Sequence, residues 1–392
     1  MEQQTKLRRA VSAKTVKPLR SAKQAKLVLE DGSEYSGWSF GKARSQAGEV
    51  VFTTGMAGYP QSLTDPSFRG QILVSTYPLV GNYGVPLSKS GEPFFDEAGI
   101  PVHFESGRIQ VSGFVVSEAC EEPSHFASGL TLASWLERNN VPGIWGIDTR
   151  ALTIRLREHG VMMGKILVEG SRDVTLDSGL VPHPVADVSP AETSVLFPAG
   201  MTEAEAAVLP TIALVDCGAK ANIIRCLLAR KVKVLRLPWN HDLSGITFDG
   251  IFLSNGPGDP KACGRTIAMV RKAFSLGKPV FGICLGNQIM ALAAGADTYK
   301  LPYGHRGQNQ PCIESGGRCY ITSQNHGYAV RAETLPSGWE PWFINGNDGT
   351  IEGIRCSTGP FSAVQFHPEG CPGPRDTEFL IDRFIEQVKV MK

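Results

Sequence analysis

The sequence contains no long run of apolar residues. Its apolar stretches fall short of the roughly 18 residues that a membrane-spanning helix needs, so we expect no membrane insertion. An excess of charge of one sign is also missing, because 39 Lys and Arg residues face 38 Asp and Glu residues. That balance argues against binding to nucleic acid or to a membrane surface. With 42% hydrophobic residues among 392, the chain can form two or three globular domains.

Cysteine motifs and nucleotide-binding motifs are absent as well. The nine cysteines are scattered, without a C-x-x-C pair, which argues against a zinc ribbon or a thioredoxin motif. A disulfide framework is not expected in a chain of this length, and free thiols imply a reducing compartment, so we expect a cytoplasmic location. We also expect no metal site. Neither G-x-x-x-x-G-K-[ST] nor G-x-G-x-x-G occurs, and nucleotide binding is therefore not expected on this chain.

Residues 1–25 differ in composition from the rest of the sequence. They contain seven Lys or Arg residues between Lys6 and Lys23, with Glu2 as the only acidic residue. No apolar segment accompanies these charges, so the pattern does not match a secretory signal. We interpret this segment as a disordered basic tail, with an organellar transit segment as the alternative.

Residues 26–170 are rich in short strand patterns separated by Gly and Pro. Asp31-Gly32 lies between two alternating segments and is typical of a hairpin turn. Further strands are expected at 49–54, 71–76 and 109–116, and the 3.6-residue period predicts helices at 130–138 and 149–158. This half is therefore predicted to be a strand-rich α+β domain. Four prolines punctuate residues 171–209, which we interpret as a connector.

Residues 210–392 show a different pattern, in which strand and helix segments alternate. Apolar runs typical of buried parallel strands occur at 211–216, 232–237, 250–254 and 279–283. Segments with a helical period lie between and after them, at 220–229, 261–276 and 286–294. Alternation of this kind predicts an α/β domain with a parallel sheet covered on both faces. Ligands bind such sheets at the carboxyl ends of the strands.

The sharpest local motif is Gly282-Ile-Cys284-Leu-Gly286, between an apolar strand and an apolar helix. It has the nucleophile-elbow pattern, with Cys in place of Ser. The tight turn requires small flanking residues, and the amides and dipole of the following helix favour a thiolate. The backbone N–H of Leu285 is then placed to donate to an oxyanion. An inert buried cysteine is the alternative, which the glycines and the strand-to-helix context disfavour.

A thiolate nucleophile for acyl transfer needs a proton carrier and a group to orient it. His367 and Glu369 follow a predicted strand at 363–366, and Pro368 between them favours an extended backbone. Residues two apart in an extended chain project to the same side, so these two side chains can pair. His326, within Gln324-Asn-His-Gly-Tyr328, is the rival base, but only His367 has a carboxylate at i+2.

Together with the loop Asn255-Gly-Pro-Gly-Asp-Pro260, these features resemble the class I glutamine amidotransferases. Segments of the first half, such as Gly48-Glu-Val-Val-Phe-Thr-Thr-Gly-Met and Gly146-Ile-Asp-Thr-Arg, resemble the small subunits of carbamoyl phosphate synthetases. The resemblance implies a triad of Cys284, His367 and Glu369. It also implies an oxyanion hole at the amides of Gly256 and Leu285. The implied glutamine-binding residues are Ser67, Gly256, Gly258, Leu285, Gln288, Asn325, Gly327 and Tyr328. Tyr328 departs from the Phe common in that family.

The resemblance further implies what this chain does and what it binds. It implies hydrolysis of L-glutamine and a large ATP-using partner subunit, which holds ATP and Mg²⁺ while this chain holds no cofactor. The partner would use the released ammonia to make carbamoyl phosphate, an intermediate of arginine and pyrimidine biosynthesis. Two alternatives stay open: a free-standing hydrolase of γ-glutamyl amides, and a docking subunit with a vestigial triad. The first half of the chain disfavours the former, and the intact triad disfavours the latter.

Overall fold

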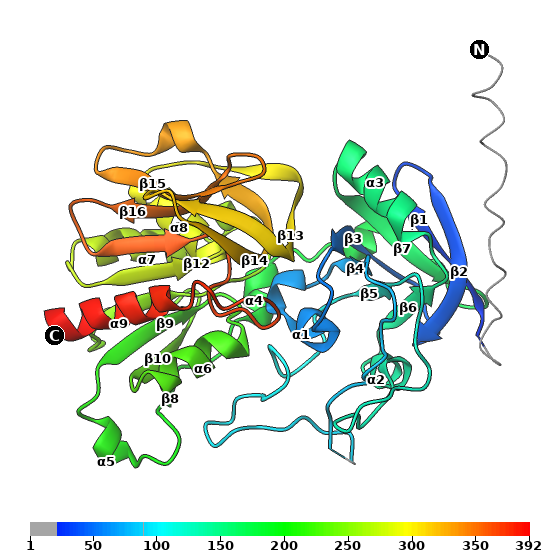
Figure 1. Ribbon diagram of the computed structural model, residues 1–392, viewed down its shortest axis with the longest axis horizontal. Helices are drawn as coiled ribbons and strands as arrows, with labels where there is room; N and C mark the ends of the chain where they lie inside the picture. Colours follow the sequence, from blue (N-terminus) through cyan, green and yellow to red (C-terminus); the bar gives the residue numbers. More distant parts are fainter. Residues whose placement is uncertain (1–21, 89) are drawn as a thin grey trace.

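The computed structural model describes residues 22–88 and 90–392, and most of the predicted basic tail lies outside these residues. The described chain forms a closed barrel from its first half and a ten-stranded sheet from its second half. Figure 1 shows the two sheets side by side, with the helix α4 (Pro184–Val188) between them. Among the described residues, no helix has the length and apolarity to span a bilayer.

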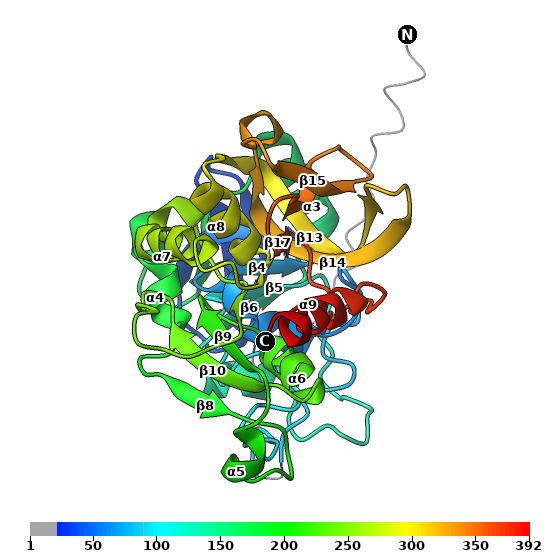
Figure 2. The same cartoon turned by 90° about the vertical axis from the view of Figure 1, so that its left-hand side faces the viewer.

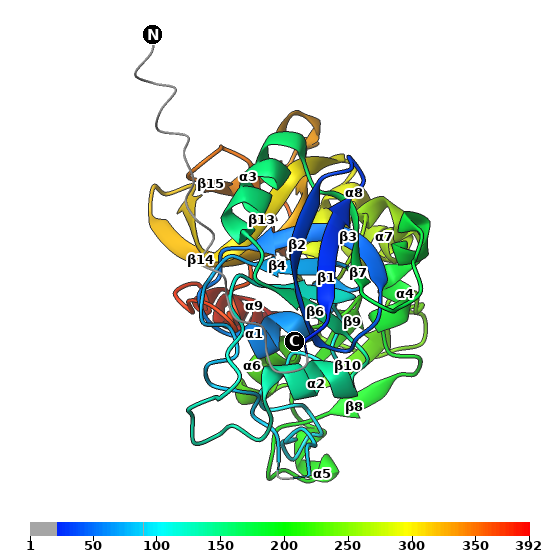
Figure 3. The same ribbon diagram turned by 90° about the vertical axis from the view of Figure 1, so that its right-hand side faces the viewer.

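Seven short strands close the barrel of the first half (Figure 3). The strands are β1 (Gln24–Leu29), β2 (Glu34–Gly41), β3 (Gln46–Thr53), β4 (Ile72–Ser75), β5 (Gly113–Val115), β6 (Pro142–Trp145) and β7 (Met162–Val168). Their order around the barrel is β1-β2-β6-β5-β4-β3-β7. The predicted hairpin joins β1 and β2, with Gly32 at φ +82°. The expected strands are present, but closure was not predicted because it depends on long-range pairs such as β1 with β7.

The helices of this half begin at side-chain caps. The helix α2 (Leu132–Arg138) starts after Thr131, whose hydroxyl accepts from the Ser134 amide. The helix α3 (Thr149–His159) starts after Asp148, whose carboxylate accepts from the Ala151 amide. Such caps satisfy amides that lack an intrahelical partner. Both predicted helices are therefore confirmed, with small shifts at their ends. Shorter elements, α1 (Tyr59–Thr64) and the 3-10 turn η1 (Pro66–Phe68), lie between β3 and β4.

Parallel strands form the centre of the second sheet. In spatial order they are β10 (Lys233–Pro238), β9 (Thr211–Asp216), β11 (Gly250–Leu253), β12 (Val280–Ile283) and β17 (Phe361–Val364). Along β9, Ile212 and Leu214 pack into one core while Ala213 and Val215 pack into the other. This alternation follows from the two-residue period of a strand. It explains why apolar side chains occupy both faces of the sheet.

Helices cover both faces of this sheet (Figure 2). The helices α6 (Ala221–Ala229) and α9 (Phe379–Met391) contribute to one core. The helices α7 (Gly264–Phe274) and α8 (Leu285–Ala294) contribute to the other. The predicted α/β arrangement with both faces covered is confirmed.

The sheet is nevertheless mixed rather than purely parallel. At one edge, β13 (Thr298–Glu314), β14 (Cys319–Val330), β15 (Trp339–Asn345) and β16 (Ile351–Cys356) pair antiparallel. At the other edge, β8 (Ser194–Leu196) pairs antiparallel with β10. Short connections, such as residues 315–318 between β13 and β14, allow only antiparallel pairing. The expectation of a parallel sheet therefore holds for the central strands only.

The predicted connector, residues 171–209, runs from the barrel to the outer edge of the second sheet, where β8 pairs with β10. It contains the turn η2 (Leu176–Gly179), α4, β8 and the one-turn helix α5 (Glu203–Ala206). The turn η2 packs on β3, since a Cβ on Gly179 would lie 2.4 Å from the carbonyl carbon of Ala47. Beyond it, the hydroxyl of Ser189 donates to the Asp216 carbonyl oxygen at 2.6 Å. The segment thus fixes the two halves against each other.

Candidate active site

Cys284 occupies the sharp turn between β12 and α8. Its backbone has φ 55° and ψ −106°, a conformation that L-residues rarely adopt and that often marks functional sites. Both flanking glycines are required by close contacts. A Cβ on Gly282 would lie 2.7 Å from the backbone of Gly286, and one on Gly286 would lie 2.4 Å from the Leu253 carbonyl oxygen. The structure therefore has the predicted nucleophile elbow.

The thiol of Cys284 lies at the amino end of a ten-residue helix. Its backbone N–H donates to the Val364 carbonyl oxygen at 2.8 Å, which anchors the turn to β17. The sulfur lies 3.6 Å from the carbonyl oxygen of Asn325 on β14. Amides of the first helical turn have no intrahelical acceptor, so the N–H of Leu285 is available to an oxyanion beside the sulfur.

His367 and Glu369 form the pair expected from their spacing. The Nδ1 atom of His367 lies 2.7 Å from Glu369 Oε1, and both side chains are buried. Backbone bonding to β14 fixes the histidine, whose N–H donates to the Ser323 carbonyl oxygen. Its other ring nitrogen, Nε2, has no hydrogen-bond partner within the described part of the chain. The imidazole is thus oriented through one nitrogen, and the other is left for chemistry.

The electrostatics of this pair favour the charged forms of both groups. Burial opposes charge on His367, but the Glu369 carboxylate outweighs it and raises the pKa of His367 to about 10. The nearby Cys284 side chain contributes in the same direction. Burial likewise opposes charge on Glu369, yet Lys220 and His367 lower the pKa of this carboxyl to about 2. His367 is therefore suited to hold a proton beside the sulfur.

Lys220 is a functional residue that the sequence reasoning missed. Its ammonium lies 3.2 Å from Glu369 Oε1 and donates to the Gly370 carbonyl oxygen at 2.6 Å, with only 2% of the side chain exposed. Burial would lower the pKa of Lys220, but the carboxylates of Glu369 and Glu105 outweigh it and raise it. The helical period includes Lys220 in a helix, whereas the residue is the N-cap of α6. Lys220 follows the carboxyl end of β9, as Cys284 follows that of β12, and this position is the sequence signal that could have identified it.

A cavity of about 110 Å³ opens at Cys284, between the barrel and the second sheet. Seven of the eight predicted glutamine-binding residues line it: Ser67, Gly256, Gly258, Gln288, Asn325, Gly327 and Tyr328. The eighth, Leu285, is buried and adjoins the cavity through its position next to Cys284. A larger hollow, of about 570 Å³, lies on the barrel at β1, β2 and β7, but no triad residue lines it. The smaller cavity is therefore the candidate substrate site.

Both halves of the chain build the wall of this cavity. The Asn255 amide donates to the hydroxyl of Ser67 at 2.9 Å, and the Asn325 amide donates to Asp65 at 3.2 Å. Gly256 has no room for a side chain, because a Cβ there would lie 2.2 Å from the Cys217 carbonyl oxygen. The position of Ser67 thus depends on contacts across the two halves.

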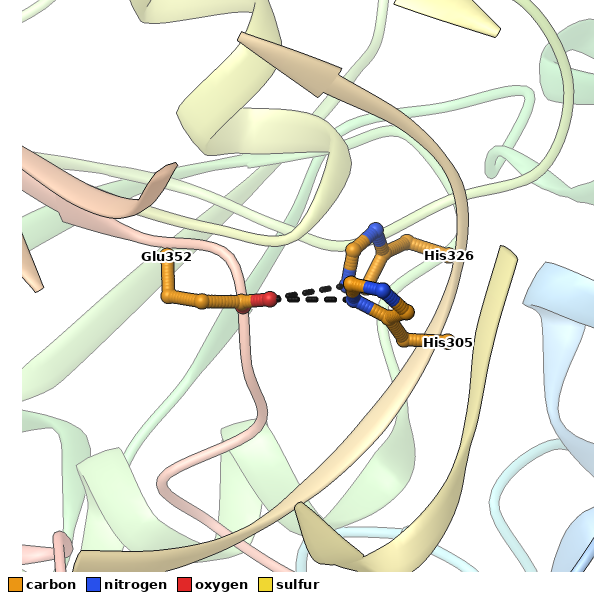
Figure 4. A group of neighbouring side chains, drawn as sticks. All are labelled: His305, His326 and Glu352. Carbon is orange, nitrogen blue, oxygen red and sulfur yellow. Dashed lines mark hydrogen bonds and ion pairs between the residues drawn. The ribbon is translucent and has the colours of Figure 1, made fainter. Parts of the chain in front are cut away.

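The rival base, His326, is engaged elsewhere, as Figure 4 shows. Its Nδ1 lies 2.9 Å from the Tyr328 carbonyl oxygen, and its Nε2 lies 3.6 Å from Glu352 Oε1. Glu352 also bonds to His305 at 3.1 Å. Burial lowers the pKa of His326, despite Glu352, so its neutral form is favoured. His326 is therefore held by contacts in the cavity wall, whereas Nε2 of His367 has no partner among the described residues.

The same cluster is a group of potential metal ligands in the described chain. The ligand atoms of His305, His326 and Glu352 all lie within 4.8 Å of one another. Hydrogen bonds from Asn345 to Glu352 at 3.0 Å, and between His305 and Asp348 at 2.9 Å, already engage these groups. The contacts are those of a buried hydrogen-bond network, which such polar groups require.

Comparison with known proteins matches each half separately. Residues 213–387 match the family Glutamine amidotransferase class-I, and residues 27–166 match Carbamoyl-phosphate synthase small chain, CPSase domain. Among solved structures, a protein of Thermoplasma acidophilum described as a component of GMP synthase is 23% identical, with a TM-score of 0.42 over 46% of this chain and 95% of that one. That structural likeness is too weak to carry an argument.

Three relatives show how the chain relates to whole proteins. The carbamoyl phosphate synthase arginine-specific small chain of Neosartorya fischeri is 43% identical, over 96% of this chain and 83% of its own length. Multifunctional protein URA2 of Saccharomyces cerevisiae and multifunctional protein pyr1-3 of Dictyostelium discoideum are each 46% identical over 93% of this chain. The chain spans only 18% and 17% of their respective lengths. Because the match to the arginine-specific small chain covers most of that relative, this chain belongs to the carbamoyl phosphate synthase small chain family and carries a class I glutamine amidotransferase domain.

Proposed function

We propose that this chain is the glutaminase subunit of a glutamine-hydrolysing carbamoyl phosphate synthetase. The observation that carries the proposal is the buried triad at Cys284. A strained cysteine at a helix amino end adjoins a histidine whose Nδ1 lies 2.7 Å from a carboxylate. Membership of the small-chain family supports the same activity. Cys284 lines the candidate substrate cavity.

The first half of the reaction forms a covalent acyl-enzyme. The Cys284 thiolate attacks the side-chain amide carbon of glutamine, and the amide oxygen becomes an oxyanion. The N–H groups of Leu285 and Gly256 stabilise it, an effect of roughly 3–4 kcal/mol per donor in comparable sites. His367 then gives its proton to the leaving nitrogen, which releases ammonia and leaves a γ-glutamyl thioester.

The second half regenerates the enzyme. His367, now neutral, removes a proton from a water molecule, which attacks the thioester carbonyl. Collapse of the intermediate expels the thiolate and releases glutamate. Glu369 keeps Nδ1 of His367 protonated throughout, so that Nε2 acts first as the acid and then as the base. Lys220 holds Glu369 in its charged form.

The ammonia is used on a second polypeptide or domain. We propose a large subunit that binds ATP and Mg²⁺ and makes carbamoyl phosphate from bicarbonate, ammonia and two ATP. The family includes proteins named as separate small chains and others in which the matching segment is part of a multifunctional protein. A division of labour explains why the present sequence has a glutaminase site and no nucleotide-binding motif. The cytoplasmic location stays a prediction.

The test is glutamate release from glutamine, measured on the purified chain with and without the co-purified large subunit. We expect slow release by the chain alone, faster release in the complex, and a γ-glutamyl thioester trapped by acid quenching. Full activity of the isolated chain would favour a free-standing hydrolase. A complex that forms without releasing glutamate or trapping thioester would favour a docking subunit with a vestigial triad.

A further inference from the structure

One wall of the substrate cavity carries three charged side chains outside the triad. Glu49 comes from β3 of the barrel, whereas Lys300 and Arg306 come from β13 of the second sheet. All three line the same cavity as Cys284. Arg306 is the more buried of the two cations, with 6% of its surface exposed.

Two of these charges neutralise each other. The ammonium of Lys300 lies 2.7 Å from Glu49 Oε1, and the Gln71 amide donates to Glu49 Oε2 at 2.8 Å. Both carboxylate oxygens of Glu49 are therefore engaged. Lys300 has its counter-ion and is half-exposed.

Arg306 has no counter-ion within hydrogen-bonding distance in the described chain. Its Nη1 donates to the Tyr303 carbonyl oxygen at 2.6 Å, and its Nε is buried without a partner. Among residues 22–88 and 90–392, no carboxylate forms an ion pair with it. Burial lowers the pKa of Arg306, and the charges of Glu49 and Cys284 oppose that shift. Buried charges in proteins are normally paired, so Arg306 lacks an anion in direct contact with it.

The guanidinium lies against the same cavity wall as Gly327. A Cβ on Gly327 would lie 3.2 Å from Arg306 Nη2, which places this nitrogen against a segment that lines the cavity. Arg306 also pairs across β13 and β14 with Asn325, whose carbonyl oxygen is 3.6 Å from the Cys284 sulfur. The unpaired cation and the nucleophile therefore share one small cavity.

We propose that Arg306 is a substrate-specificity residue that binds the α-carboxylate of L-glutamine. This inference rests on the proposed glutaminase function. A planar guanidinium matches a carboxylate in shape and charge and binds it through two parallel hydrogen bonds. Substrate binding then supplies the anion that the buried cation lacks, and amides without an α-carboxylate are discriminated against.

The test combines substrate and side-chain changes in the assembled enzyme. Wild type, Arg306→Gln and the control Arg157→Gln are assayed with L-glutamine and with 4-aminobutanamide, which lacks the α-carboxylate. Arg157 is exposed, does not line the cavity, and lies over the Tyr303 ring at 5.8 Å. Where the analogue is turned over too slowly, its inhibition constant against glutamine replaces kcat/KM.

Arg306→Gln is expected to lower kcat/KM for glutamine by about 10- to 100-fold, the usual effect of losing a charged hydrogen-bonding partner. The analogue should lose less than about 3-fold, so that the preference for glutamine collapses. Arg306→Lys should retain part of the preference, and Arg157→Gln all of it. Co-purification of each variant with the large subunit in the wild-type ratio shows that the variant has folded and assembled.

Equal losses for glutamine and for the analogue would overturn the proposal, because Arg306 would then act through Cys284 or through the fold. A changed pH profile of Cys284 alkylation by iodoacetamide in Arg306→Gln would identify the first of these. An unchanged preference for glutamine would also overturn it. Failure of wild type to release glutamate refutes the proposed function instead, and the two failures are thus distinguishable.

Discussion

Residues of opposite charge are buried side by side in the candidate site around Cys284. Lys220 contacts Glu369, Glu369 contacts His367, and each of the three side chains is at most 2% exposed. Charged groups in such an environment are stable only while they remain paired. Replacing one of these three residues should therefore change the protonation of its neighbour, in addition to any loss of packing.

The choice of base is the first prediction at this scale. His367→Ala should lower kcat for glutamine hydrolysis by about 10²- to 10⁴-fold, since it removes the proton carrier. His326→Ala should be milder and act mainly on KM, because His326 supports the Tyr328 carbonyl that the cavity wall needs. Steady-state glutaminase assays of both variants decide this. The reverse order would mean that His326 is the base.

Lys220→Met provides the second prediction. The Lys220 cation holds the pKa of Glu369 down, so its loss raises that pKa and the carboxylate protonates at higher pH. The acidic limb of kcat/KM for glutamine should therefore move to higher pH. The matched control, Lys261→Met, removes an exposed ion pair with Asp297 and should leave the profile in place. An unmoved limb in Lys220→Met would contradict this role.

At the scale of elements, the strand-to-helix turns position the chemistry. Cys284 follows β12, Lys220 follows β9 and Gly256 follows β11, three neighbouring strands of the parallel centre. Because carboxyl ends of parallel strands share an edge, these turns meet without any local signal linking them. The proposed base, His367, is positioned in another way, because it lies in the segment after β17 and its backbone bonds to β14.

The third prediction concerns Gly286, which lies in the first turn of α8, just after β12. Gly286→Ala should lower glutaminase activity and the melting temperature, because the new methyl group meets the backbone of β11 at 2.4 Å. Gly264→Ala is the control, since its Cβ would meet nothing within 4 Å and Gly264 lies in α7. That variant should be neutral or slightly more stable. Gly286→Ala and Gly264→Ala are compared by thermal unfolding and by glutaminase assays. Equal stability of the two variants would contradict the packing argument.

The limits of sequence reasoning follow from the same geometry. Cys284, His367 and the glycine loops were predictable because their signals lie within a few adjacent residues. Barrel closure by β1 and β7, the antiparallel edge at β13 and β14, and the roles of Lys220 and Arg306 were not. Each of those depends on partners far apart in sequence, such as Lys220 with Glu369. No local sequence pattern distinguishes a Lys or Arg residue that will be buried from one that will be exposed to solvent.

On the scale of the whole molecule, the site exists only where the two halves meet. The barrel contributes Ser67, Glu49 and Gln71 to the cavity, and the second sheet contributes the nucleophile and most of the remaining wall. Contacts such as Asn255 with Ser67 and Lys300 with Glu49 cross between them. The barrel therefore forms part of the candidate site itself, in addition to any role in binding the proposed large subunit.

The central claim is that Cys284 supplies ammonia to a reaction completed at another site. The most direct measurement is carbamoyl phosphate synthesis by the assembled Cys284→Ser complex, with glutamine and with added ammonia as alternative nitrogen donors. We predict that glutamine-dependent synthesis is abolished while ammonia-dependent synthesis keeps the wild-type rate. An equal loss with both donors in a correctly assembled complex would contradict the role assigned to Cys284.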